Sequence, residues 1–97
     1  MSRWLVEKRL SQSAERIKQL RAELVVVDEQ LVFLADAADE ARLRALVSET
    51  PLADKEHREA QKHAEAMSRR KAEIVTSIAD LVRTQDELLD RLMGEAG

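Results

Sequence analysis

The sequence predicts an all-α fold in which two long helices form an antiparallel coiled-coil hairpin. Three observations predict it: the composition, a repeated spacing of apolar residues, and a single proline at mid-chain. The chain has 97 residues, of which 36% are charged and 44% hydrophobic, with one Trp, one Phe, no Tyr and two Gly. Such a composition is typical of long helices. The length of the chain allows one domain. We therefore treat residues 1–97 as a single helical hairpin.

Apolar or small residues recur in each half of the chain at alternating steps of four and three. In the first half this stripe comprises Val6, Leu10, Ser13, Ile17, Leu20, Leu24, Val27, Leu31, Leu34, Ala38, Ala41 and Ala45. In the second half the same spacing gives Ala53, His57, Ala60, Ala64, Met67, Lys71, Ile74, Ile78, Leu81, Gln85, Leu88 and Leu92. Four positions of the two stripes are polar: Ser13, His57, Lys71 and Gln85. Spacing of this kind, sustained over many turns, predicts a coiled-coil seam along each helix.

The break between the halves lies at Pro51. Proline is disfavoured inside a helix, at a cost of about 3 kcal/mol, and is well tolerated at the first helical position. Thr50 and Ser2 are then the expected N-caps of the two helices, and Gly94 is the expected end of the second. A single straight helix is the alternative that the proline disfavours. The expected boundaries are helices at about 3–48 and 51–93, with the turn at about 48–51.

The two stripes match each other if the chain folds back at residue 49. Facing residues in a hairpin have numbers with a constant sum, and apolar residues then meet apolar residues along most of the seam. The pairs include Val6–Leu92, Leu20–Ile78, Leu24–Ile74, Leu31–Met67 and Ala45–Ala53. Lys71 faces Val27 in this register, so its ammonium group has to extend past the seam to reach water.

Several large apolar residues lie outside the seam and indicate a binding surface. These residues are Val25, Val26, Val32, Phe33, Val75, Val82 and Leu89. A two-helix hairpin buries one stripe on each helix and leaves such residues exposed, and exposed apolar patches mark interfaces. The surface predicts a non-enzymatic protein–protein interaction module, a coiled-coil adaptor or assembly protein. Self-association into a dimeric four-helix bundle, docking of a helix or groove from another protein, and scattered exposed valines without a role remain open.

A second candidate surface lies at the turn. Its residues are Leu46, Val47, Glu49, Leu52 and Asp54, and they either pack the end of the hairpin or form a protein-binding tip. The acidic turn resembles the coiled-coil hairpin of the bacterial transcript-cleavage factors and related proteins that enter the secondary channel of RNA polymerase, with Glu49 and Asp54 as the matching acidic residues. The resemblance implies, as an alternative function, a bacterial transcription regulator that presents its acidic tip to RNA polymerase.

Other classes of function find no support in the residues. The chain has no Cys, and its two histidines, His57 and His63, do not make a zinc site. No phosphate loop, catalytic triad or enclosed pocket is expected, so we predict no enzymatic activity and no cofactor, metal or small-molecule ligand. The interspersed charges, with a net charge of −3, do not form a nucleic-acid-binding stripe. The apolar stripe lacks a Lys/Arg border for membranes, and we expect a cytoplasmic protein.

Trp4 is the one tryptophan and lies near the predicted open end of the hairpin. It is expected to cover the seam beside Met93. Anchoring of a partner is the alternative, because tryptophan is favoured at the centre of protein interfaces.

Overall fold

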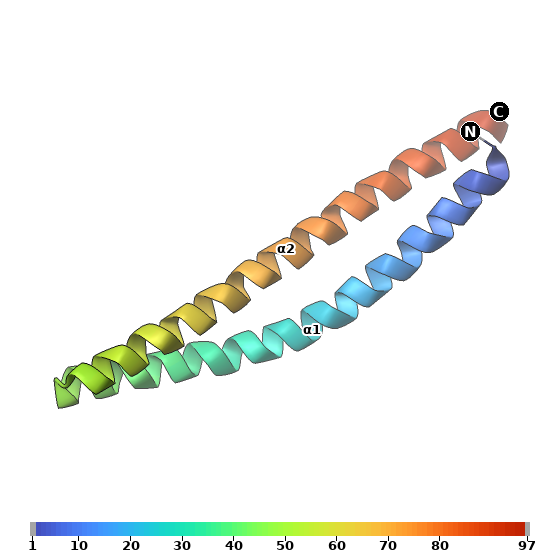
Figure 1. The fold of residues 1–97 in the computed structure, drawn as a ribbon. Coiled ribbons are helices and arrows are strands. Elements are labelled where there is room, and N and C mark those ends of the chain that lie inside the picture. Colours follow the sequence, from blue (N-terminus) through green and yellow to red (C-terminus); the bar gives the residue numbers. More distant parts are fainter. Residues whose placement is uncertain (1, 97) are drawn as a thin grey trace. The chain divides into compact units, whose positions relative to one another are not determined.

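The computed structural model describes residues 2–96 and the side chains of residues 2–94. Two helices account for nearly all of this range: α1 (Arg3–Ser48) and α2 (Pro51–Ala96), joined by Glu49 and Thr50 (Figure 1). The predicted fold class, an all-α antiparallel helical hairpin, is therefore confirmed.

Contacts within the chain group its residues into two compact units, and each unit is built from both helices. Unit 1 contains α1 up to Leu24 and α2 from Glu73 onward. Unit 2 contains Val25–Ala72 and hence the turn. The start of α1 and the end of α2 therefore belong to the same unit.

Both predicted N-caps are present. The Leu5 amide donates a hydrogen bond to Ser2 Oγ at 3.3 Å, and the Ala53 amide donates one to Thr50 Oγ1 at 3.2 Å. Each bond satisfies one of the amides that a helix start leaves without an intrahelical partner. Pro51 occupies the first position of α2, where its missing N–H is of no consequence.

The turn follows α1 directly. Glu49 adopts a left-handed backbone conformation, with φ at 51°, and its amide donates to the Ala45 carbonyl at 3.1 Å. A residue in this conformation commonly ends a helix, although glycine usually occupies the position because it has no Cβ. The turn therefore holds a non-glycine residue in a conformation that favours glycine.

The end of α2 differs from the prediction. The helix continues through Gly94 to Ala96, whereas the glycine was expected to end it near residue 93. No glycine of the described range adopts a positive φ. Gly94 therefore makes no left-handed cap, and in a helical conformation it costs only about 1 kcal/mol relative to alanine.

The core coincides with the two predicted stripes. All the stripe residues are buried or half-buried, and every residue that is buried between positions 2 and 94 belongs to a stripe. The buried residues of unit 1 are Val6, Ile17, Leu20, Ile74 and Leu88, and those of unit 2 are Val27, Ala38, Ala41 and Ala53. Because alanine buries little apolar area, the fully buried part of unit 2 gains less from the hydrophobic effect than that of unit 1.

Candidate functional site: the outer side of α1

In unit 2, α1 exposes seven large apolar residues, of which Leu43, Leu46 and Val47 lie toward the turn. The other four are Val25, Val26, Val32 and Phe33, and each has between 50% and 73% of its surface open to solvent. Two adjacent pairs seven residues apart lie on one side of a helix, here the side away from the seam residues Val27 and Leu34. We call these four residues the outer stripe.

The outer stripe has no counterpart on α2 within unit 2. Leu52, at the turn, is the only exposed large apolar residue that α2 contributes to the described part of this unit. In unit 2, α1 is thus apolar on two sides and α2 on one. The second apolar side of α1 has nothing within unit 2 to cover it, which is the condition that marks an interaction surface.

The charge around the outer stripe is negative. From Val25 to Ala41 the chain contains five acidic residues and no Lys or Arg. Asp28 is paired with Lys71 of α2, at 2.8 Å between carboxylate and ammonium. The remaining acidic residues, all exposed, are Glu29, Asp36, Asp39 and Glu40. None of these four takes part in an ion pair within the described residues. The absence of basic residues over this stretch is a signal that the sequence alone carries.

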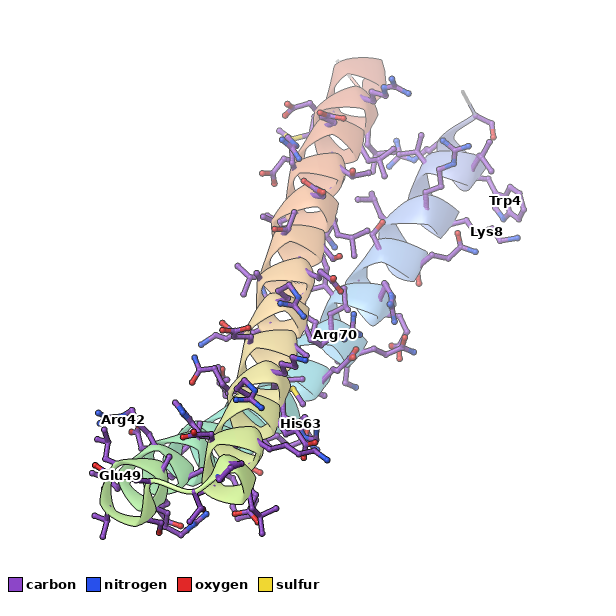
Figure 2. The ribbon with its side chains drawn as sticks, turned by 60° about the vertical axis from the view of Figure 1, so that its left-hand side comes forward. Trp4, Lys8, Arg42, Glu49, His63 and Arg70 are labelled. Carbon is purple, nitrogen blue, oxygen red and sulfur yellow. The ribbon has the colours of Figure 1, made fainter. Side chains whose placement is uncertain are left out.

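An open groove between the helices of unit 2 adjoins the outer stripe. One part of it is lined by Glu29, Gln30, Phe33, Leu34 and Met67. Leu34 and Met67 are also shared with a second part, whose other lining residues come from α2: Lys62, His63, Glu65, Ala66, Arg69 and Arg70. His63 and Arg70 lie on the same side of α2 (Figure 2). The groove therefore has an apolar floor, an acidic and aromatic edge on α1, and a mainly basic edge on α2.

The predicted surface also includes residues of unit 1. Val75 and Leu89 are exposed, as expected, whereas Val82 is half-buried. These three side chains belong to α2 of unit 1, and the outer stripe is confined to α1 of unit 2.

The expectation that Trp4 covers the seam is wrong. Both Trp4 and Met93 are largely exposed. The ring of Trp4 lies against the ammonium of Lys8, 5.1 Å from the ring centroid, and both side chains project together from α1 (Figure 2). This cation–π contact between residues one turn apart holds the ring on the outside of the helix.

The tip residues are all exposed. Val47 has 86% of its surface open to solvent, and Leu46 and Leu52 are also largely exposed. Glu49 lies in the turn (Figure 2), and Asp54 lies in the first turn of α2, where the helix dipole favours an acidic side chain. The structure thus places apolar and acidic groups side by side at the tip, without packing the apolar ones.

The histidines show no arrangement typical of a metal site. His57 is a half-buried seam residue and His63 is exposed at the groove. Within the described range, no group of three or more His, Asp or Glu side chains is placed to hold a metal ion. Neither helix, over the same residues, carries an apolar stretch long enough to span a membrane.

No protein-family model matches the chain, and neither the curated proteins nor the solved structures contain a significant match.

Proposed function

We propose that this chain is a cytoplasmic, non-enzymatic protein-interaction module that binds its partner through the outer stripe. The observation that carries the proposal is the exposure of Val25, Val26, Val32 and Phe33 on one side of α1. Aligned apolar side chains on a helix are removed from water when a second helix packs along them, which supplies the driving force for binding.

The hairpin itself supports this function as a scaffold. The outer stripe lies on a regular helix whose opposite side is buried against α2, so its side chains are presented with a fixed spacing. A site on a regular element is positioned more accurately than one on a loop. The helix therefore offers a partner a pre-organised surface and spares it the cost of ordering a flexible segment.

The test is the double substitution Val32→Glu and Phe33→Glu. In the complex these two acidic side chains would be buried against the partner, so we expect binding to be lost. The partners are the proteins that co-purify with the unaltered chain from its native host, and mass spectrometry identifies them. Helix content, followed by circular dichroism, should not change, because both residues are exposed in the free chain.

A matched control uses Ser11→Glu and Gln12→Glu. These residues are exposed, lie on the same helix and occupy the same two positions of the seven-residue repeat. The control adds the same charge on α1 but belongs to unit 1 and is not part of the outer stripe. If the same partners are retained by both variants, the outer stripe is not the binding surface.

The tip is a second candidate, supported by the exposed Leu46, Val47 and Leu52 beside Glu49 and Asp54. Here the chain would act as a transcription regulator that presents its acidic tip to RNA polymerase. Substituting Glu49→Ala and Asp54→Asn should then abolish an effect on transcription in a purified polymerase assay, while the outer-stripe variant retains it. An effect that survives the tip substitutions would exclude this second function.

A further inference from the structure

The chemistry of the outer stripe restricts the class of partner. Glu29 lies between the two apolar pairs on the same side of α1, Asp36 lies one turn beyond Phe33, and Asp39 and Glu40 take the positions of the next pair. Because α1 carries no Lys or Arg between Val25 and Ala41, and none of these four acids forms an ion pair within the described residues, the partner meets apolar side chains bordered by unpaired negative charge. Such a surface favours a positively charged partner, because complementary charge raises the rate of association and the specificity of binding.

The spacing of the outer stripe indicates a helical partner. Val25 and Val26 are followed seven residues later by Val32 and Phe33, which is two helical turns. Side chains of a second helix that runs alongside α1 repeat with this period, whereas those of an extended strand alternate with a period of two. A helix therefore matches both pairs at once.

The groove beside Phe33 provides a place for an anchoring side chain. Phe33, Leu34 and Met67 line it, and Glu29 and Gln30 border it. Methionine adapts its shape readily to an incoming apolar group. Phe33 belongs to both the outer stripe and the lining of this groove, so the groove adjoins the surface on which a partner helix would lie.

A second copy of the chain is a poor occupant. Two outer stripes facing each other would set the acidic residues of one copy against those of the other. In unit 2, α2 exposes Lys62 and Arg69 but no large apolar residue apart from Leu52. Trp4 and Lys8 do place an exposed apolar side chain beside a basic one. The next residues on that side of α1, however, are the polar Ser11, Gln12 and Glu15. The apolar contact of Trp4 is therefore limited to one turn.

We propose that the outer stripe binds an amphipathic helix of another protein whose apolar side is flanked by lysine and arginine. This inference rests on the proposed function and specifies the partner. The apolar residues of that helix cover Val25, Val26, Val32 and Phe33, and its basic flanks lie opposite Glu29, Asp36, Asp39 and Glu40.

The experiment compares two synthetic helical peptides with identical apolar residues at alternating steps of three and four. One peptide carries lysine and arginine beside the apolar side, and the other carries glutamate. Both are titrated with the full chain by fluorescence anisotropy. We expect the basic peptide to bind about tenfold more tightly or better, and the difference to shrink as salt screens the charges.

Two variants separate the contributions of charge and apolar contact. Asp36→Asn, Asp39→Asn and Glu40→Gln together should remove most of the preference for the basic peptide, because they neutralise three of the four acids. Val32→Ser with Phe33→Ser leaves the charge unchanged and should weaken binding of the basic peptide about tenfold or more. Circular dichroism confirms that each variant remains helical.

Equal affinity for the two peptides, tighter binding of the acidic one, or no binding of either overturns the inference. So does a dimer, measured by light scattering, that Val32→Ser and Phe33→Ser dissociate, since a second copy would then be the occupant. In these cases the proposed function still stands if the Val32→Glu, Phe33→Glu variant loses its native partners. If that variant loses none, the proposed function fails as well.

Discussion

The ammonium of Lys71 on α2 lies 2.8 Å from the carboxylate of Asp28 on α1. Lys71 is a polar residue in the apolar seam, and the sequence pairs it with Val27, whose direct neighbour is Asp28. The contact agrees with the predicted register of unit 2. The Lys71 ammonium was expected to extend past the seam to water, and it forms an ion pair with Asp28 instead. The lysine leaves the seam toward a carboxylate on the partner helix, where both groups are about half-exposed.

Replacing Lys71 with methionine should stabilise the hairpin. An ion pair between half-exposed groups contributes about 0–1 kcal/mol, whereas methionine in the seam would bury apolar area against Val27, at about 0.8 kcal/mol per buried methylene group. We expect the free energy of unfolding, from urea denaturation followed by circular dichroism, to rise by about 0.5–1 kcal/mol. A decrease would show that the ion pair outweighs apolar packing at this layer.

A double-mutant cycle measures the Lys71–Asp28 interaction itself. Asp28→Ala should lower the free energy of unfolding by up to about 1 kcal/mol in the unaltered chain and leave it nearly unchanged in the Lys71→Met background. The pair Lys55–Glu59, at 3.9 Å within α2 and more exposed, serves as the control and should show weaker coupling. Equal coupling in the two pairs would contradict a special role for the interhelical contact.

Ile74 and Val75 are adjacent residues with opposite environments. Ile74 is 0% exposed and Val75 is 47% exposed. Ile74→Ala should lower the free energy of unfolding by about 2–4 kcal/mol, because it removes buried methyl groups and leaves a cavity. Val75→Ala should change it by less than about 0.5 kcal/mol, as is usual for exposed positions. Similar decreases in the free energy of unfolding for both substitutions would show that the seam is assigned to the wrong residues.

The seam and the caps were predictable because they depend on local chemistry and a short repeat. The stripe with Ile17 and Leu20 on α1 and the stripe with Ile74 on α2 both follow the helical period. The caps at Ser2 and Thr50 follow from single hydroxyl groups before helix-forming sequence. The end of α2 was not predictable in this way. Gly94 ends a helix only if it adopts a left-handed conformation, and the residues after it do not determine that choice.

The candidate site was predictable in part. The periodicity excludes Val32 and Phe33 from the seam, so their exposure follows from the pattern. The partial cover of Val82 and the exposure of Trp4 depend on how side chains beside the seam pack, which spacing alone does not fix. The groove at Leu34 and Met67 is likewise a product of two helices in contact, and no residue pattern indicates it.

Thr50→Ala tests the cap at the start of α2. Loss of the bond from the Ala53 amide to Thr50 Oγ1 should lower the free energy of unfolding by about 1 kcal/mol. Thr84→Ala is the matched control, because the Thr84 hydroxyl donates to the Asp80 carbonyl, whose helical hydrogen bond does not depend on it. The control should be neutral or slightly stabilising, since alanine is the better helix former. Equal decreases in the free energy of unfolding for the two variants, measured by urea denaturation, would show that Thr50 has no capping role.

Glu49→Gly should stabilise the turn. A residue with a Cβ in the left-handed conformation costs roughly 1–2 kcal/mol, and glycine avoids this cost while adding entropy to the unfolded chain. The net gain in the free energy of unfolding is expected to be at most about 1 kcal/mol. Glu49→Ala keeps the Cβ and removes the same carboxylate, so it should remain within about 0.5 kcal/mol of the unaltered chain.

The two Glu49 variants also separate backbone strain from charge at the tip. Both lack the carboxylate, and only the glycine variant relieves the positive φ. If the tip acts on RNA polymerase through its acidic group, both variants lose the effect on transcription to the same extent, although their midpoints of urea denaturation differ. An effect retained by alanine and lost by glycine would instead tie the activity to the fixed turn conformation, and the acidic group would not be responsible.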